Sequence, residues 1–240
     1  MKRQSIRVDE TIATITAEEH LIPPALKLVQ ESRELILSYI NEDPEFESSL
    51  SPVDVSKNAP VLIRRMAEAS AIANVGPMAS VAGAIAQFVV EGLVADGADH
   101  VIFDNGGDIA MYLSQPVIAG IYAGPTAIDG LGLRISSLGT LLGLCTSSGT
   151  VGHSFSYGVA DAAIVYSPDV ALADAVATRL GNQITVRDPE ILTSSMRAVM
   201  FDGIEGVMTI LGDAIGTCGH LPEVVKANVD YDLISKAWEV

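Results

Sequence analysis

The chain has 240 residues, of which 49% are hydrophobic and 5% aromatic, and its formal net charge at pH 7 is −16. This length and apolar content are sufficient for one core, and we expect residues 1–240 to form a single domain. The acidic charge argues against nucleic-acid partners and anionic membrane surfaces, since both are bound by releasing counterions from phosphate groups with Lys and Arg.

The two cysteines, Cys145 and Cys218, provide neither a disulfide framework nor the paired spacing of a zinc site. The opening sequence MKRQSIRVDETIATIT lacks the apolar segment of a signal peptide, and we expect a cytoplasmic protein. The apolar stretch PMASVAGAIAQFVVEGLVADG is interrupted by Gln87 and Glu91, which favours a buried helix over a membrane span.

The first part of the chain reads mainly as helix. The alternating β-branched residues of 5–16 predict one strand, followed by a helix that ends near Asn41. Residues 42–60 read as an acidic linker, and further helices are expected over 60–73 and 77–95.

Short strands dominate after Gly97. HVIFDNGGDIAMYL predicts two strands joined by a tight Asn-Gly-Gly turn. A helix is expected over 169–184, with Ser167 as its cap. Other expected strands are 117–123, 132–136, 139–146, 161–167, 197–201 and 206–212, with a polar loop at 146–158 and a terminal helix at 230–240. Grouped helices followed by grouped strands indicate an α+β fold.

The helix at 169–184 carries an unusual polar pair. Asp174 and Thr178 lie one turn apart on a face whose other residues are Ala and Gly. Carboxylate and hydroxyl oxygens are ligands for Mg²⁺ or Ca²⁺, so a metal site is one interpretation. A solvated face, or a carboxylate that favours the helix start, is the alternative.

Three segments together resemble the ApbE superfamily of flavin transferases: GPMASVAGAIAQFVVEGLVADGADHVIFDNGGDIAMYL, LCTSSGTVGH and VADAAIVYSPDVALADAVATRLGN. They are most similar to the branch with a VGPMA-VAGAIA segment and an NGGDI turn. The resemblance covers about residues 58–182, which leaves 1–57 as an N-terminal strand, helix and acidic linker. It implies an α+β, T-fold-type duplicated arrangement of helices packed on antiparallel sheet.

The resemblance also implies a site. Asp174, Thr178 and the backbone carbonyl of Ala82 would hold Mg²⁺ (or Ca²⁺), and the family uses the metal to split FAD and move FMN onto a protein threonine. The residues expected to line the nucleotide site are Asn105, Gly106, Gly107, Thr146, Ser147, Ser148 and Gly149. Glycines at 106, 107 and 149 would allow close approach and offer N–H groups to phosphate.

Asp108 and His153 are the candidate catalytic residues. Asp108, like Asp104, is alternatively a turn residue, and His153 an exposed loop histidine. Cys145 is either a nucleophile or a small core residue.

Two hypotheses follow for the function. The first is a Mg²⁺-dependent, FMN transferase-like enzyme that acts on FAD or a related nucleotide. The second is an accessory protein of cofactor or sulfur metabolism that binds an anionic metabolite without the chemistry. It is motivated by Gly83, where flavin transferases carry Lys, and by the absence of Asp-Pro after His153. A homo-oligomer packed through the Ala and Gly faces is compatible with either hypothesis.

Overall fold

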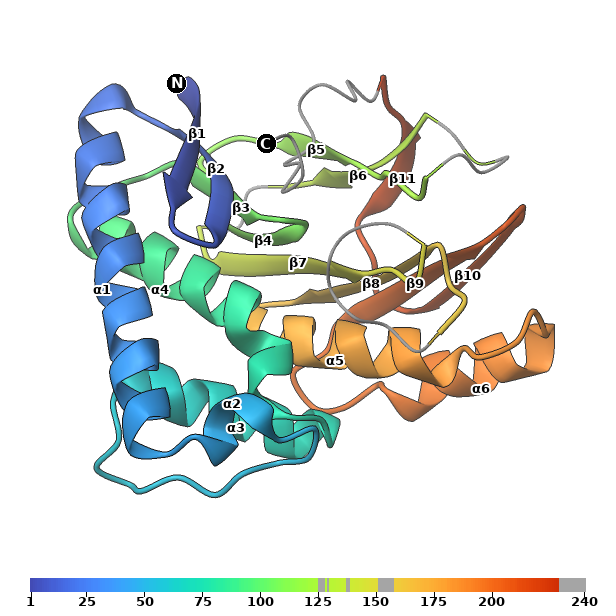
Figure 1. Ribbon diagram of the computed structural model, residues 1–240. Helices are drawn as coiled ribbons and strands as arrows, with labels where there is room; N and C mark the ends of the chain where they lie inside the picture. The colour runs from blue at the N-terminus through green and yellow to red at the C-terminus, as the bar shows by residue number, and fades with distance from the viewer. Residues whose placement is uncertain (125–127, 129, 137–138, 151–157, 229–240) are drawn as a thin grey trace.

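The computed structural model describes residues 1–124, 128, 130–136, 139–150 and 158–228 (Figure 1). Among these residues, the main sheet is eight-stranded, with the order β1-β2-β3-β4-β7-β8-β9-β10, and neighbouring strands are antiparallel. Its strands are β1 (Lys2–Val8), β2 (Thr11–Ala17), β3 (Val101–Asn105), β4 (Asp108–Tyr112), β7 (Leu141–Ser147), β8 (Ala162–Ser167), β9 (Gly206–Leu211) and β10 (Ala214–Gly219). A smaller sheet has the order β11-β6-β5, formed by β5 (Val117–Gly120), β6 (Leu131–Ile135) and β11 (Glu223–Lys226).

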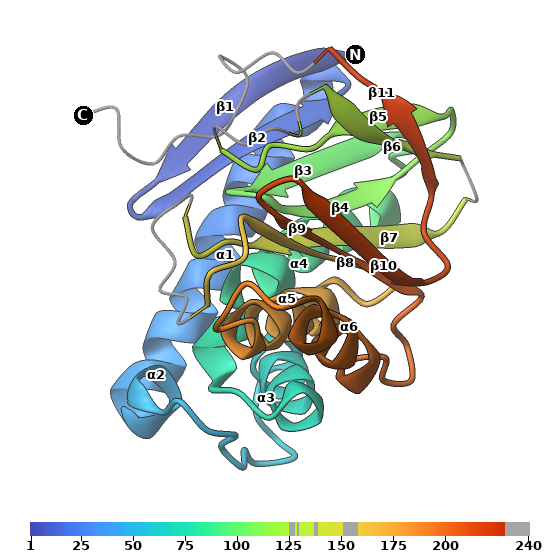
Figure 2. The same cartoon turned by 90° about the vertical axis from the view of Figure 1, so that its right-hand side faces the viewer.

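The helices lie together on one face of the main sheet, and the small sheet covers part of the other face (Figures 1 and 2). They are α1 (Ile22–Glu42), α2 (Glu45–Ser48), α3 (Val61–Ala73), α4 (Val81–Ala95), α5 (Val170–Gln183) and α6 (Pro189–Ala198), with 3₁₀ turns at η1 (Glu19–Leu21) and η2 (Pro77–Ser80). The expected α+β fold with helices on antiparallel sheet is therefore confirmed.

Two apolar clusters hold these layers together. The larger lies between the helices and the main sheet, and the smaller lies between the two sheets and includes Leu133, Ile135 and Met208. All six residues of β8 are buried, because α5 covers one face of this strand and the smaller cluster lies on the other. This burial explains the continuous run AAIVY that precedes Ser167.

Several sequence expectations need correction. The single strand expected at 5–16 is a hairpin, since β1 and β2 pair antiparallel on either side of Asp9, which has φ of +50°. Residues 197–201 are not a strand, because α6 extends through Ala198. The cap of α5 is Asp169 rather than Ser167, because the Asp169 side chain accepts from the N–H of Leu172.

The structure also adds elements that the sequence interpretation omitted. The acidic linker contains the short helix α2, whose Phe46 is fully buried, and β10 and β11 were not expected. The helix expected at 230–240 lies outside the described residues.

The apolar stretch Pro77–Ala95 is a core helix in this fold. By length and composition it could cross a membrane, and it is the one such stretch in the described chain. Half of it is buried within the protein, where α4 packs on β3, β4, α1 and α5. The expectation of a buried helix is therefore confirmed.

Candidate functional site

The turn between β3 and β4 is a tight hairpin that requires glycine. Gly106 and Gly107 have φ of +74° and +105°, values that residues with a Cβ rarely adopt. The N–H of Gly107 donates to Oδ1 of Asp104 at 2.9 Å, so Asp104 acts as a turn residue. At the tip, Nδ2 of Asn105 donates to the carbonyl oxygen of Ala82 at 3.1 Å. The turn therefore lies directly against the start of α4.

Asp108, the first residue of β4, places a carboxyl in an unfavourable environment. Its Oδ1 is shut off from solvent and has no hydrogen-bond partner among the described residues. Burial raises the pKa of Asp108 well above its usual value, and the charges of Asp174 and Asp104 raise it further. The Cys145 thiol and the Thr146 N–H lower this pKa in part. The charges of two further aspartates thus act on the Asp108 carboxyl at the hairpin.

Asp174 reaches the same place from α5. The residue is 8% exposed, and its Oδ2 accepts a hydrogen bond of 2.8 Å from the N–H of Gly83 in the first turn of α4. Burial raises the pKa of Asp174 to about 7, and the N–H groups of Gly83 and Ala82 oppose this rise. The face that carries Asp174 is therefore not solvated: it packs against α4.

Ala82 and Thr178 were also expected to bind the metal, and the structure places them differently with respect to the Asp174 carboxyl. Ala82 is adjacent to Asp174, but its carbonyl oxygen already accepts from Asn105. Thr178 is half-buried and lies one helical turn beyond Asp174 on α5. The structure thus brings Ala82 to Asp174, with Asn105 at the carbonyl of Ala82 and Thr178 on the same helix.

The Thr-Ser-Gly segment adjoins the turn at the end of β7. A Cβ on Gly107 would lie 4.0 Å from the carbonyl oxygen of Thr146, so β7 and the hairpin tip are neighbours. Beyond Ser147 the chain turns towards β8, where the N–H of Gly149 donates to the carbonyl oxygen of Ala160 at 2.9 Å. The N–H groups of Gly107 and Gly149, which we expected to face phosphate, therefore donate within the chain.

Internal bonds also hold the end of this segment. The N–H of Thr150 donates to Oγ of Ser148 at 3.1 Å. Oγ1 of Thr150 donates to Oδ1 of Asp161 at 3.1 Å, and Oδ2 of Asp161 accepts from the N–H of Gly212 at 2.7 Å. Asp161 is thus a buried anchor for the loop. His153 lies outside the described residues.

Cys145 behaves as a core residue. It is fully buried, its Sγ donates to the carbonyl oxygen of Val170 at 3.5 Å, and burial and the Asp108 charge raise the pKa of the thiol well above its usual value. A raised pKa disfavours the thiolate, which is the nucleophilic form. The core interpretation of Cys145 fits these observations.

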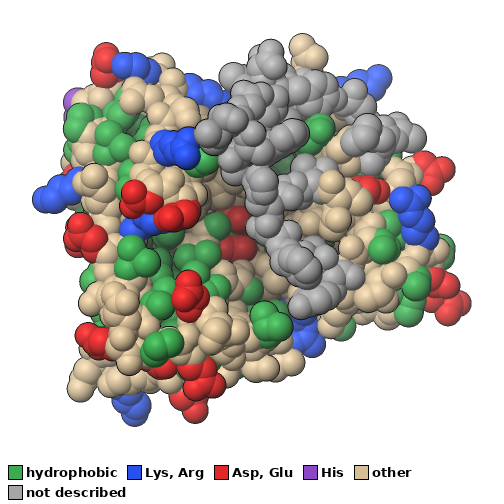
Figure 3. All heavy atoms as spheres, viewed as in Figure 1, with side chains coloured by type: hydrophobic (Ala, Val, Ile, Leu, Met, Phe, Trp, Pro, Cys, Tyr) green, Lys and Arg blue, Asp and Glu red, His purple; other side chains and the backbone are tan. Residues whose placement is uncertain are grey.

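The described residues contain no cluster of three or more His, Cys, Asp or Glu side chains with metal-binding geometry. Figure 3 shows acidic side chains scattered over this face of the molecule, in keeping with the net charge of −16. Any metal site here would use backbone, hydroxyl or substrate oxygens besides carboxylates.

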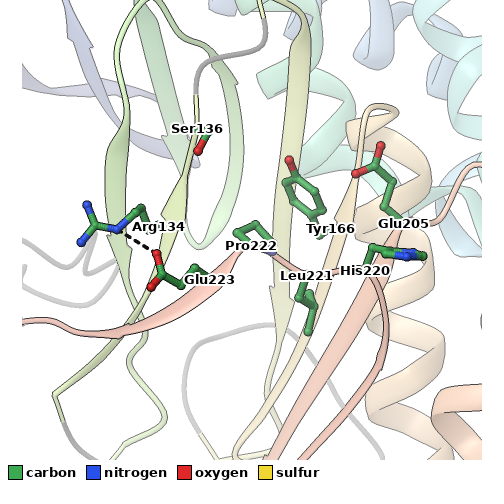
Figure 4. Close-up of a pocket in the computed structure, with 8 residues that line it drawn as sticks. All are labelled: Arg134, Ser136, Tyr166, Glu205, His220, Leu221, Pro222 and Glu223. Carbon is green, nitrogen blue, oxygen red and sulfur yellow. Dashed lines mark ion pairs between the residues drawn. The ribbon is translucent and has the colours of Figure 1, made fainter.

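A separate cavity of about 250 Å³ lies between the small sheet, strand β8 and the segment that follows β10 (Figure 4). Its rim carries an ion pair of 3.2 Å between Arg134 and Glu223. Burial and the charge of Glu205 raise the pKa of Tyr166 on its wall. None of the residues expected at the nucleotide or metal site lines this cavity.

The comparisons with known proteins decide the family. A family model described as "AbpE bacteria" matches residues 2–204. The chain belongs to this ApbE-like family. It is 45% identical over 235 residues to the UPF0280 protein of Methanocella arvoryzae, covering 98% of this chain and 96% of that one. It is also 45% identical over 240 residues to the UPF0280 protein of Methanothrix thermoacetophila, covering 98% and 100%.

Solved structures similar to this ApbE-like chain are flavin transferases. The Pseudomonas stutzeri flavinyl transferase ApbE, in its apo form, superposes with a TM-score of 0.50 at 13% identity, covering 90% of this chain and 93% of that one. The H257G mutant of the Vibrio cholerae flavin transferase ApbE gives 0.57 at 10% identity, covering 92% and 97%. At such low identity the similarity demonstrates the fold alone. The resemblance to the superfamily is confirmed, and the family match begins well before residue 58.

One residue that packs against the site of this ApbE-like chain was not predicted. Gln87 on α4 is 6% exposed and accepts hydrogen bonds from the N–H groups of Val170 and Ala171 at the start of α5. Its signal was present in the sequence, because it interrupts the apolar stretch of α4. A single polar residue in such a helix indicates a partner that the sequence does not name.

Proposed function

We propose that this ApbE-like protein binds a divalent cation, Mg²⁺ or Ca²⁺, where the β3–β4 turn meets α4 and α5. The cation would hold the phosphates of FAD or a related nucleotide, in the manner of an FMN transferase. Asp108 and Asp174 would supply carboxylates, and Ala82 and Thr178 a carbonyl and a hydroxyl. These are all oxygen donors, the type that both ions prefer.

One observation carries this proposal: Oδ1 of Asp108 is buried without a partner, beside the charge of Asp174. A buried carboxyl oxygen without a hydrogen bond costs free energy, and a second carboxyl beside it increases the cost. A bound cation would remove both penalties.

The acidic composition of the chain also favours a metal ion as the partner of a phosphate group. A pyrophosphate needs positive charge, and the chain has 14 Lys and Arg against 30 Asp and Glu. A divalent ion would neutralise a pyrophosphate and polarise its phosphoryl oxygens. Asn105, which fixes the hairpin tip on Ala82, would orient the nucleotide.

The first test measures metal binding. Calorimetry of metal-free protein with MgCl₂ or CaCl₂ is expected to show one site in the wild type, weakened by about a hundredfold or more in Asp108→Asn or Asp174→Asn. Asp161→Asn is the matched control, since it also changes a buried carboxyl but lies on the loop anchor. Equal affinity in the wild type and both site variants would exclude this site.

The second test measures turnover. Incubation with FAD and Mg²⁺ is expected to release AMP, with FMN left free or attached to protein, and the Asp174→Asn variant is expected to lose this release. The same assay decides a second candidate, an accessory protein that binds the nucleotide without cleaving it. That candidate is favoured because Gly83 brings a backbone N–H, not a cationic side chain, to Asp174. Binding of FAD without AMP release would support it.

A further inference from the structure

Gln87 is a polar residue on the apolar, buried side of α4. Its neighbours on this side include Gly83, Ala84, Val90 and Leu93. Burying a side-chain amide costs free energy unless its hydrogen bonds are made. The contacts of Gln87 therefore show what offsets this cost.

The amide oxygen of Gln87 caps another helix. Its Oε1 accepts from the N–H of Val170 at 3.0 Å and from the N–H of Ala171 at 3.1 Å. These are the first two N–H groups of α5, which have no acceptor within their own helix. Asp169 accepts from the next one, on Leu172. Gln87 thus completes the cap of α5 from outside that helix.

The two helices cap each other. Asp174 of α5 accepts from the N–H of Gly83 in the first turn of α4, and Gln87 of α4 accepts from the first turn of α5. On each helix the capping side chain lies four residues after the capped position, at 83 and 87 and at 170 and 174. A Cβ on Gly83 would lie 2.5 Å from the carbonyl oxygen of Val170, so the helices are in direct backbone contact at this point.

Two further residues fix the orientation of the Gln87 amide. Its Nε2 donates to Oε1 of Glu91 at 3.0 Å, and the same oxygen accepts from the guanidinium of Arg65 at 3.0 Å. A carboxylate can only accept hydrogen bonds. The amide nitrogen must therefore face Glu91, and the oxygen must face α5.

We propose that Gln87 is a positioning residue for the metal site, through the relay Arg65–Glu91–Gln87. By holding the first turn of α5 on α4, it sets the distance between the Asp174 carboxyl and the start of α4. This inference rests on the proposed function, because it treats that carboxyl as a metal ligand. Gln87 itself touches α5 and Glu91, and acts on the ion only through Asp174.

The test uses three variants of the full chain. Gln87→Met keeps the shape of the side chain and removes both hydrogen-bonding groups. Gln87→Glu combined with Glu91→Gln exchanges the partners but keeps an acceptor towards α5. Asp188→Ala is the matched control, because Asp188 likewise accepts from two N–H groups, at the start of α6.

Two measurements separate positioning from a merely structural role. In metal-free protein, hydrogen exchange at the Gly83 amide is expected to become faster in Gln87→Met and to stay near the wild-type rate in the exchanged pair and in the control. The dissociation constant for Mg²⁺ is expected to rise by about tenfold or more in Gln87→Met alone, as for other residues that orient metal ligands. Should Gln87→Met fail to fold, Glu91→Leu is a milder change expected to move both readouts in the same direction.

The outcomes distinguish this inference from the proposed function. Unchanged exchange at Gly83, or Mg²⁺ affinity equal to the wild type in a folded Gln87→Met variant, would overturn the positioning role and leave the metal site standing. A wild type that does not bind Mg²⁺ would overturn the proposed function. Faster exchange at Gly83 would then assign Gln87 to the helix interface alone.

Discussion

At the scale of single residues, Asp174 joins α5 to α4 through a hydrogen bond and also has the electrostatic environment of a candidate metal ligand. Its Oδ2 is used by the N–H of Gly83, yet the pKa remains raised to about 7 because burial outweighs that hydrogen bond. The pKa of the neighbouring Asp108 is raised as well. Both groups thus hold their protons more strongly in the folded chain than in the unfolded one.

This raised pKa predicts how stability depends on pH. An unfolded Asp loses its proton near pH 4, whereas Asp174 keeps it to about pH 7. Between these values the folded state binds more protons, so stability falls as pH rises through the window and stays low above it. We expect the melting temperature of metal-free protein to be lower at pH 8 than at pH 5 by roughly 5 °C or more.

Asp174→Asn separates this effect from the general repulsion of an acidic chain. The amide imitates the protonated carboxyl and still accepts from the N–H of Gly83, so the variant is expected to show a clearly weaker pH dependence in scanning calorimetry. Mg²⁺ is expected to raise the melting temperature of the wild type most at pH 8, where the carboxylate is formed. Parallel pH profiles of variant and wild type would contradict the role of Asp174.

At the scale of elements, the site depends on how closely α4 and α5 approach. A Cβ at position 83 would meet the carbonyl oxygen of Val170 at 2.5 Å and Cβ of Asp174 at 2.7 Å. Gly83→Ala is therefore expected to destabilise the protein by about 2 kcal/mol and to weaken Mg²⁺ binding, since α5 must shift. Denaturant unfolding and metal titration measure the two effects.

Gly92→Ala on the same helix is the control for this substitution. The nearest atoms its Cβ would meet all belong to the Leu28 side chain, whose methyl groups, at 2.7 and 2.8 Å, can move aside. The gain in helix propensity from Ala is the same at both positions, about 1 kcal/mol. Equal stability of the two variants would show that the close contact between α4 and α5 is not needed.

At the scale of the whole molecule, sequence patterns identified the layers and the local motifs but not how they meet. The Asn-Gly-Gly turn and the pair Asp174 and Thr178 could be predicted because each is a pattern of residues close together in the sequence. The cap from Gln87 to Val170 joins positions 83 residues apart, and the burial of Asp174 depends on α4. No periodicity contains such contacts, which is why Asp174 was compatible with a solvated face until the fold was known.

The limits of the resemblance, residues 58–182, lead to a last prediction about the whole chain. A fragment with those limits would lack β2, which pairs with β3, and β9, which pairs with β8. It would also lose α1, which packs on α4, and buried residues such as Ile15 and Val207.

Two newly exposed strand edges favour aggregation. The fragment is therefore expected to give no cooperative thermal transition and a poorly dispersed NMR spectrum, while the full chain is expected to unfold cooperatively and to give a well-dispersed spectrum under the same conditions. A cooperatively folding fragment would show that the site region is stable without the N-terminal hairpin, and that the strands flanking it contribute little to holding α4 and α5 together.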